Sequence, residues 1–456
     1  EHEELKTSYV NLVYYDLFER FFVQNAIKNK ICHICTKKKD VIGEIPLQMK
    51  FYGTTNLLFF ENLKKQEAYE SFSICRQCLQ EVLTGMKYTS THLHGRILGL
   101  TCYMVPSLET KEKDFENKYR RIFDILKKND GYSQGIVQLQ RLVKKSKRKN
   151  FFFNLLFYDS PPGSQAFNII KLISNIDYKG LIWKLEIFDN LNKEYGLSYL
   201  HKSISLNDLR IHLFQTKASH ENADPKLYRK EILDLFEAFL QEYPISYYNL
   251  ITKFMHMFRL KFNRKTDSIL AAFKMILILR IFNEINSLKG ARTMEGKAGN
   301  KVTEIQNEHF RSFIETHRTI YGKNFHRQGL FLLGAIINSI INAQKKKAFE
   351  KQGQKEQNEQ SGKNGHQHRK LSATFMKKLN FSGIPARRVN RLVAETRNFA
   401  NIYDIYEDPG IWGNIMDRLQ GIDESSMKPD EIVFYILTGI SYANYISMKK
   451  GLEKKE

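Results

Sequence analysis

Four of the five cysteines in this 456-residue chain form two Cys-x-x-Cys pairs, one in ICHIC and one in SICRQC. Two such pairs supply four thiolates, which suit a tetrahedral zinc site. A site closed by four protein ligands is usually structural, because it leaves no position for water or substrate. The pattern therefore predicts one structural Zn²⁺ and points to no chemistry beyond it. The predicted ligands are Cys32, Cys35, Cys75 and Cys78.

Other residues near the pairs leave alternatives open. His33 lies inside the first pair and could replace a cysteine as a ligand. His92 and His94 form an H-x-H pair, which we interpret as polar surface because no carboxylate stands nearby in the sequence. Cys102 is expected to be a small buried apolar side chain.

The cysteines need elements that hold them. Residues 1–31 carry an apolar stripe that predicts a helix, and 32–105 form the predicted zinc module. The 39 residues between the pairs exceed the usual spacing of a compact ribbon. They include strand-like runs at Met49–Tyr52 and Leu57–Phe60, which indicates a zinc ribbon with an insertion.

The charge balance suggests the kind of partner. The chain has 71 Lys and Arg against 49 Asp and Glu, a formal charge of +22. Residues 301–456 contain 25 basic and 17 acidic residues, a net of +8, so the remaining +14 lies in 1–300. An excess spread over both halves favours a polyanion, most simply nucleic acid, contacted along an extended track. The alternative is a generally basic composition without a specific partner.

Two basic segments are candidates for that contact. The first precedes the apolar run FFFNLLFY, a predicted buried strand, and its alternative interpretation is a solvated loop. The second lies on a helix predicted over Pro385–Tyr403, where spacings of three and four place arginines close to one face. The candidate nucleic-acid residues are Arg141, Lys144, Lys145, Lys147, Arg148 and Lys149 in the first segment, and Lys377, Lys378, Arg387, Arg388 and Arg391 in the second.

The rest of the pattern predicts a mostly helical α+β fold. Residues 1–105 form an N-terminal region with a zinc ribbon, 106–290 a mixed, helix-dominated middle domain, and 300–456 a bundle of about five helices. Within them we expect a turn at Pro161-Pro162-Gly163 and a helix over Ala166–Ile173. The low-complexity stretch 344–370 is expected to be a disordered loop between helices.

Familiar enzyme motifs are missing from the sequence. It contains no phosphate loop, no G-x-G-x-x-G run, no H-E-x-x-H motif and no G-x-S-x-G elbow. We therefore expect a protein that is not an enzyme. The alternatives are a zinc-ribbon nucleic-acid enzyme, such as a nuclease or modifying enzyme, and a zinc-dependent scaffold without a nucleic-acid role.

Location follows from what is absent. No signal peptide is recognisable, and the most apolar run, Ile269–Phe282, is short and interrupted by Lys274 and Arg280. The few cysteines argue against a secreted disulfide scaffold. We expect a cytoplasmic protein without a membrane contact. The chain begins with Glu1, so its natural start is expected to lie upstream.

The order of features resembles the large subunit of a type I-B CRISPR Cascade effector complex. Four features support the resemblance and together span most of the chain. They are the two cysteine pairs, the segment Phe151–Leu181, the segment Phe331–Gln344, and a C-terminal helical region ending in Phe434–Ala443. The chain is shorter at its N-terminus than that family suggests, and no base-reading loop can be matched.

The resemblance implies a non-catalytic subunit. Its partners would be the guide RNA near its 5′ end, the target duplex DNA with its displaced strand, and a helicase-nuclease. They would also include the backbone, guide-end-capping and small subunits of Cascade. The subunit would recognise the protospacer-adjacent motif and stabilise the R-loop, while guide pairing reads the sequence. The C-terminal bundle would resemble the small subunit, and Met294 or Met376 could start a separate copy of it.

Overall fold

The computed structural model describes most of the chain, with gaps. The described residues are 12, 20–43, 69–107, 120, 124–126, 152–160, 167–214, 228–263, 270–291, 304–322, 324–356, 379–405 and 409–453. Several predicted features lie outside them: the runs Met49–Tyr52 and Leu57–Phe60, the turn at 161–163, and residues 357–370 of the predicted loop.

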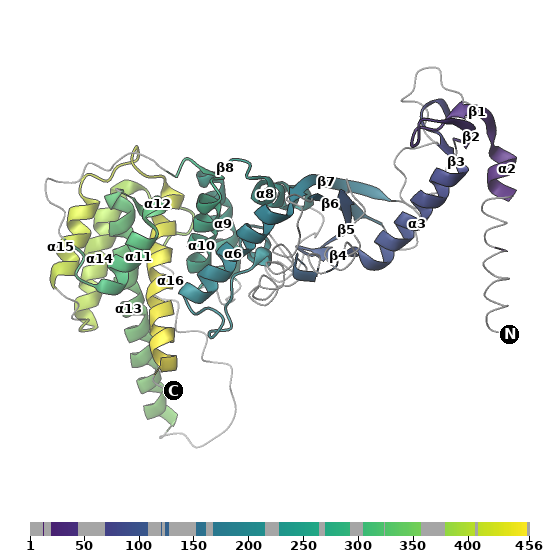
Figure 1. The fold of residues 1–456 in the computed structure, drawn as a ribbon. Helices are drawn as coiled ribbons and strands as arrows, with labels where there is room; N and C mark the ends of the chain where they lie inside the picture. Colours follow the sequence, from purple (N-terminus) through teal and green to yellow (C-terminus); the bar gives the residue numbers. More distant parts are fainter. Residues whose placement is uncertain are drawn as a thin grey trace. The chain divides into compact units, whose positions relative to one another are not determined.

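Contacts divide the chain into two compact units (Figure 1). Unit 1 comprises Glu1–Lys127 and Phe151–Asn175, and unit 2 comprises Lys128–Asn150 and Ile176–Glu456. The boundary at residues 175/176 falls inside the range 106–290, which the sequence predicted as a middle domain. Helices dominate and strands are confined to small sheets, so the prediction of a mostly helical α+β fold is confirmed.

Unit 1 begins with a small module around the cysteines. Its elements are α2 (Phe21–Asn25), β1 (Ile27–Ile31), β2 (Lys38–Ile42), β3 (Ile74–Cys75) and α3 (Arg76–His92). The three strands form an antiparallel sheet in the order β1-β2-β3. The helix predicted through residue 31 therefore ends early, at Asn25. The sequence IKNKI becomes a strand because it pairs with β2 around the turn that holds the first cysteine pair.

A second sheet of unit 1 has four strands. They are β4 (His94–Ile97), β5 (Leu100–Ser107), β6 (Phe152–Asp159) and β7 (Asn168–Asp177), in that order. One face is fully buried by alternating residues, which are Cys102, Met104, Phe153, Leu155 and Phe157. The strand predicted for FFFNLLFY and the burial of Cys102 are confirmed.

The helix predicted over Ala166–Ile173 is wrong for residues 168–173, which belong to β7, whereas Ala166 lies outside the described residues. The segment NIIKLISNID is rich in isoleucine, which packs well on a pleated sheet. At the neighbouring strand β6, Asn154 accepts a hydrogen bond from the backbone N–H of Asn175 (2.9 Å). Pairing with the preceding strand β6 therefore outweighed a helical apolar pattern.

Unit 2 starts with helices that pack around one apolar core. They are α6 (Tyr178–Glu194), α7 (Leu206–Leu213), α8 (Arg229–Gln241), α9 (Tyr247–Asn263) and α10 (Ala271–Glu284), with a short parallel pair β8 (Ile245–Ser246) and β9 (Leu288–Lys289). The Asp177 carboxylate caps α6 by accepting from the N–H of Gly180 (2.9 Å). Ten of the fourteen residues of α10 are buried, which explains its largely apolar sequence. No described helix is long and apolar enough to cross a membrane.

The C-terminal helices of unit 2 share this core. They are α11 (Glu308–Thr316), α12 (Arg318–Tyr321), α13 (Phe325–Glu356), the 3₁₀ turn η7 (Ala386–Arg388), α14 (Val389–Ile402), α15 (Pro409–Leu419) and α16 (Pro429–Glu453). Tyr445 of α16 stacks on Phe273 of α10 at 4.8 Å between ring centroids. Helix α13 continues through Glu356, so residues 344–356 of the predicted loop are helical.

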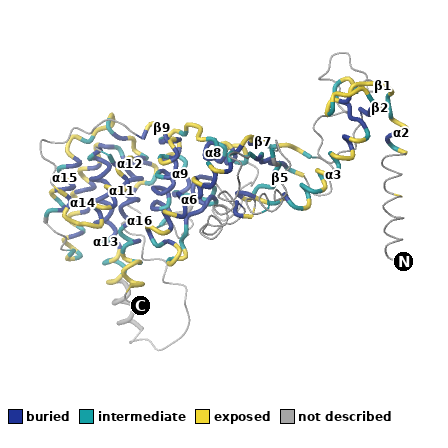
Figure 2. The backbone as a smooth tube through the Cα atoms, viewed as in Figure 1, coloured by how far each residue is buried: buried dark blue, intermediate teal, exposed yellow. Residues whose placement is uncertain are grey.

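Helices α13 and α16 cross closely in unit 2. Gly334 of α13 lies against the Ile436 carbonyl of α16, and Gly439 of α16 lies against the Phe331 carbonyl of α13. A Cβ atom at either position would collide with the facing backbone. Two glycines therefore allow the helices to approach backbone to backbone. Figure 2 shows the buried residues concentrated along these helices, whereas β1 is mostly exposed.

Candidate metal centre

Two turns present the four cysteines. Cys32 follows β1 directly, and the chain then reverses through Thr36, whose φ is +59°. The N–H of Thr36 donates to the carbonyl of Cys32 (2.7 Å), which closes the first turn. Cys75 ends β3 and precedes the first residue of α3, so Cys78 lies in the first helical turn. A strand-turn and a helix start are therefore the local structures that present the two pairs.

The four sulfurs converge. All four Sγ atoms lie within 4.8 Å of one another, and those of Cys35 and Cys75 are 3.9 Å apart. Tetrahedral zinc–thiolate bonds of about 2.3 Å place neighbouring sulfurs about 3.8 Å apart, so the spacing fits. The cysteines are free thiols, without a disulfide. The structure confirms that the predicted ligands come together at a site compatible with a metal ion.

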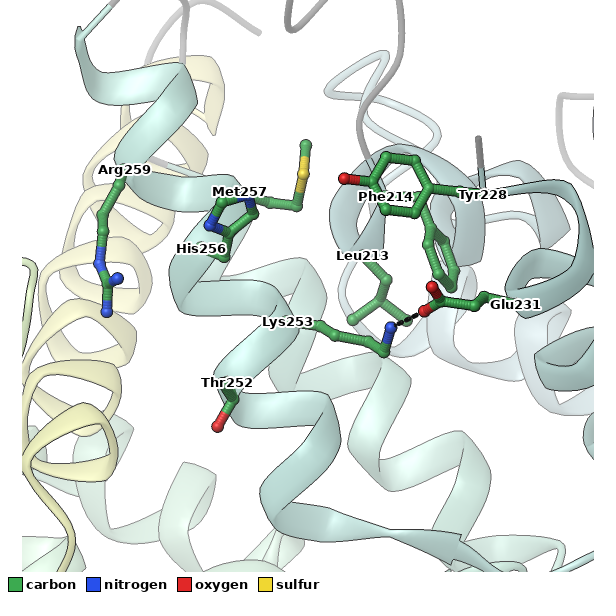
Figure 3. A pocket seen from close by; sticks show the side chains of 9 residues that line it. All are labelled: Leu213, Phe214, Tyr228, Glu231, Thr252, Lys253, His256, Met257 and Arg259. Carbon is green, nitrogen blue, oxygen red and sulfur yellow. Dashed lines mark hydrogen bonds and ion pairs between the residues drawn. The ribbon is translucent and has the colours of Figure 1, made fainter. Parts of the chain in front are cut away.

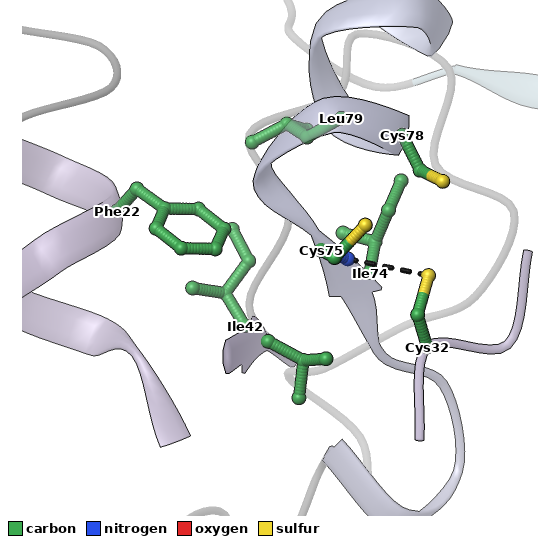
Figure 4. Close-up of a cluster of buried hydrophobic side chains, with 8 residues drawn as sticks. Phe22, Cys32, Ile42, Ile74, Cys75, Cys78 and Leu79 are labelled. Carbon is green, nitrogen blue, oxygen red and sulfur yellow. Dashed lines mark hydrogen bonds between the residues drawn. The ribbon is translucent and has the colours of Figure 1, made fainter. Parts of the chain in front are cut away.

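Hydrogen bonds prepare the site for negative charge. The N–H of Cys75 donates to the Sγ of Cys32 (3.3 Å), as Figure 4 shows. Burial opposes ionisation of Cys32, but backbone N–H groups of Cys35, Cys75 and Ile34 outweigh it and lower the Cys32 pKa to about 6. One thiolate therefore forms readily in this cluster.

The other buried sulfurs need a cation. Burial raises the pKa of Cys75 and of Cys78 above the ordinary thiol range, and the charge on Cys32 raises both further. Four thiolates this close repel one another unless a metal ion shares their charge. The donor set thus favours a bound cation when all four cysteines ionise.

His33 does not join the cluster. Its Nδ1 accepts a hydrogen bond from the N–H of Ser73 (2.9 Å), and its ring stacks on Phe72. The N–H of His33 in turn donates to the carbonyl of Ser73 (2.9 Å). His33 therefore ties the first turn to the chain before β3, and the alternative of a histidine ligand is not supported.

The core behind the cysteines is small. Its buried members are Phe22, Cys32, Val41, Ile42, Ile74, Cys75, Cys78 and Leu79. In Figure 4 the sulfurs of Cys32, Cys75 and Cys78 face one another, and Phe22 and Leu79 gather beside them. Three of the eight buried residues are cysteines, so the metal site and the core of this module are one structure.

The structure describes only part of the predicted nucleic-acid surface. The whole first segment, Arg141 to Lys149, lies outside the described residues, as do Lys377 and Lys378. Arg387 and Arg388 are exposed in η7, and Arg391 is exposed on α14. The Nε of Arg391 forms an ion pair with Glu395 (2.9 Å), which partly offsets the charge of this face.

A cavity of about 310 Å³ lies between α7, α8 and α9 (Figure 3). Phe214 and Tyr228 line one side of it. Lys253 forms an ion pair with Glu231 and lies over the Phe214 ring. Arg259 pairs with Asp430 (2.9 Å). Because these charged side chains are paired with partners within unit 2, the cavity shows no sign of an ion-binding site.

Sequence reasoning missed three cations of the cysteine module. Lys28, Lys39 and Arg76 come from three different elements, yet they line one groove. The available signal was the cluster of lysines in IKNKI and KKD, whose side chains take defined faces once the two strands pair. Without the strand assignment, these residues were counted only in the net charge.

Comparison with known proteins adds the family. Residues 29–176 match the model of the CRISPR-associated protein TM1802 central domain, and residues 204–454 match that of its C-terminal domain. No curated protein matches the chain significantly. The two matched ranges contain the four cysteines and all of the helices from α7 to α16. The chain therefore belongs to the family of CRISPR-associated protein TM1802.

Proposed function

We propose that the chain is the non-catalytic large subunit of a type I-B CRISPR effector complex. In this role it binds the 5′ region of the guide RNA and neighbouring subunits, recognises the protospacer-adjacent motif in duplex DNA, and stabilises the R-loop. Recruitment of a helicase-nuclease completes the role. The observation that carries the proposal is the family match over both halves of the chain.

Charge and site chemistry support this proposal. A formal charge of +22 spread along the chain suits a subunit that holds nucleic-acid backbones while guide pairing reads the sequence. The metal-ligating group found among the described residues consists of four cysteines. Four protein thiolates close the coordination sphere, which is typical of structural sites. That site would hold a fold together and would not bind substrate.

We further propose that the ion is Zn²⁺. The four residues that would hold it are Cys32, Cys35, Cys75 and Cys78, and tetrahedral thiolate coordination is the arrangement typical of structural zinc. When bound, it would neutralise the thiolates and join β1 and the start of α3. We expect one zinc per chain in protein purified without chelator, measured by elemental analysis.

The proposal is tested by assembly. The chain is co-expressed with a CRISPR guide RNA and the subunits encoded beside it, and a tag on the chain is used for purification. We expect the guide RNA and the other subunits to co-purify in a salt-sensitive complex. A stable, RNA-free monomer that cannot join a preassembled guide-bound complex would overturn the proposal.

A second measurement separates the enzymatic alternative. The purified chain is incubated with labelled DNA or RNA in the presence of Mg²⁺ or Mn²⁺. The proposal expects binding without turnover. Cleavage or modification that is abolished by a single carboxylate substitution would identify a zinc-ribbon enzyme instead.

A further inference from the structure

A groove runs beside the hairpin of the cysteine module. It has a volume of about 600 Å³ and lies between α2, the β1–β2 hairpin and the first turn of α3. Its basic wall is formed by Lys28, Lys39 and Arg76. Asp40 is the acidic residue among those lining it, so the lining has three cations and one carboxylate.

Two cations of this basic groove, Lys28 and Lys39, have little anionic compensation among the residues that the structure describes. Lys28 is exposed and forms no ion pair with the residues that the structure describes. The Nζ of Lys39 donates to the neutral side-chain oxygen of Gln77 (3.4 Å). Asp40 is held locally, since its carboxylate accepts from the N–H of Asn29 (3.3 Å). The groove therefore keeps an excess of positive charge.

The strand register places a further lysine opposite one that lines the groove. Lys30 and Lys39 are directly opposite each other in the β1–β2 ladder. Like charges directly opposite each other destabilise a sheet. Lys30 also lies over the ring of Tyr69, at 5.0 Å from its centroid.

The other walls of the groove suit an extended, partly apolar ligand. Val23 and Ala26 contribute apolar side chains to the lining, and Gln77 and Gln80 contribute amides. A sugar–phosphate chain presents phosphates to cations, hydroxyls to amides and a sugar face to apolar side chains. An acidic peptide could also meet these groups. The charge of +22 over the whole chain and its CRISPR-associated family favour nucleic acid.

We propose that the basic groove of the cysteine module binds the sugar–phosphate backbone of a nucleic acid. The cysteine module is then a direct contact to the guide RNA or target DNA as well as a structural element. This inference rests on the proposed nucleic-acid role of the chain, and it assigns the contact to Lys28, Lys39 and Arg76. Binding through phosphates is expected to be independent of sequence.

The first test removes the three cations from the full-length protein. The variant K28A/K39A/R76A is compared with K87A/K449A/K450A, which loses the same charge at exposed positions outside the groove. Affinities for labelled poly(U) RNA, a labelled duplex DNA and labelled polyglutamate are measured by fluorescence anisotropy over a salt series. Zinc content and circular dichroism confirm that each variant is folded.

We expect the groove variant to lose at least about tenfold in affinity for RNA or DNA at moderate salt. The salt slope is the change in log affinity with log salt concentration. Each lost phosphate contact reduces its magnitude by roughly 0.7 for single strands and 0.9 for duplex, so the loss of three contacts reduces it by about 2–3. The control variant retains most of the wild-type affinity and slope. Equal affinity and slope in both variants would overturn the inference, as would polyglutamate binding that matches RNA and DNA and depends on the groove.

A gain-of-binding variant guards against misfolding. D40N removes the groove carboxylate but keeps an oxygen that can accept from Asn29. We expect nucleic-acid binding about two- to fivefold tighter, an increase that unfolding cannot imitate. Unchanged or weaker binding by folded D40N counts against the groove. If the wild-type protein binds neither RNA nor DNA, both the proposed function and this inference fail. If the wild-type protein binds nucleic acid and the groove variants bind it with the same affinity, this inference alone fails.

Discussion

The cysteine module and the helical unit 2 are held together by different means. The module has a core of eight buried residues, three of which are cysteines at the candidate metal site. In unit 2, the single helix α10 buries ten residues of its own. A core as small as that of the module rarely supports a fold without a metal or disulfide. We therefore expect a bound metal ion to stabilise the module, whereas apolar packing stabilises unit 2.

This difference makes the two regions separable by experiment. Loss of the metal should unfold the cysteine module while unit 2 stays folded. Changes in the core of unit 2 should lower its free energy of unfolding without releasing metal. Each prediction below tests one side of this contrast and uses the other as an internal reference.

The largest effect is expected from Cys75→Ser. It removes a buried ligand, and metal binding of this type supplies about 10–16 kcal/mol of folding free energy. We expect loss of zinc and rapid hydrogen exchange over residues 27–42, with protection in α10 and α16 unchanged. Cys102→Ala is the matched control, because Cys102 is buried in β5, outside the metal cluster. Retention of one zinc per chain by the Cys75 variant would contradict the comparison.

The next effect concerns a buried ion pair of unit 2. Arg327 and Glu431 are each about 1% exposed, and the guanidinium and carboxylate are 2.8 Å apart. Arg327 also donates to the carbonyls of Ala291 (2.8 Å) and Ile320 (2.6 Å). The Glu431 carboxylate accepts a further bond from the Tyr247 hydroxyl (2.8 Å). The pair therefore connects α13, α16 and α9 inside the core.

Arg327→Met should lower the free energy of unfolding of unit 2 by about 3–5 kcal/mol, because it leaves Glu431 buried without its counter-charge. Arg391→Met is the control, since the Arg391 side chain is 82% exposed in its pair with Glu395. Exposed pairs contribute less than about 1 kcal/mol. Denaturant unfolding followed by tryptophan fluorescence and circular dichroism measures both. If both changes lower the free energy of unfolding equally, the buried pair contributes no more to the stability of unit 2 than an exposed pair does.

Glu431 also shows what sequence alone could and could not predict. A proline at position 429 followed by Asp430 and Glu431 is typical of a helix start, where carboxylates favour the helix dipole. In the structure Asp430 pairs with Arg259, and Glu431 pairs with Arg327, 104 positions away in the chain. Local pattern identifies the helix, but only tertiary packing selects the partner of a buried charge.

The same distinction separates the cysteines from β7. Two Cys-x-x-Cys pairs specify their ligands by chemistry, so the metal site was predictable across a long insertion. The segment 168–177 has an apolar pattern that suits a helix or a strand, and its pairing with β6 decided the outcome. The basic groove was equally hidden, because its cations become neighbours only after β1, β2 and α3 have assembled.

A third prediction tests the close crossing of α13 and α16. Gly334→Ala places a methyl group against the carbonyl of Ile436, and the helices must separate. Overpacking of this kind costs about 1–3 kcal/mol, and contact with backbone puts the expected loss near 3 kcal/mol. Gly413→Ala on α15 is the control, because open space surrounds it. That change should stabilise α15 by about 0.5–1 kcal/mol through helix propensity. A similar stability for both variants, measured by thermal unfolding, would mean that the crossing tolerates a wider separation.

The smallest effect is a pH dependence confined to unit 2. His317 is fully buried, and its Nδ1 donates to the Phe313 carbonyl (2.9 Å). Burial lowers its pKa to about 3, with the positive charge of Arg280 acting in the same direction. The unfolded chain binds this proton below about pH 6.5, whereas the folded chain does not until about pH 3, so stability falls as the pH drops between these values. At about 1.4 kcal/mol per pH unit, unit 2 should lose about 2 kcal/mol between pH 7 and pH 5. His317→Asn should remove this slope, while the same change at exposed His256 should leave it in place. If the slope of stability against pH persists in the His317 variant, another group causes the acid sensitivity. The contrast between unit 2 and the cysteine module would then depend on apolar packing alone.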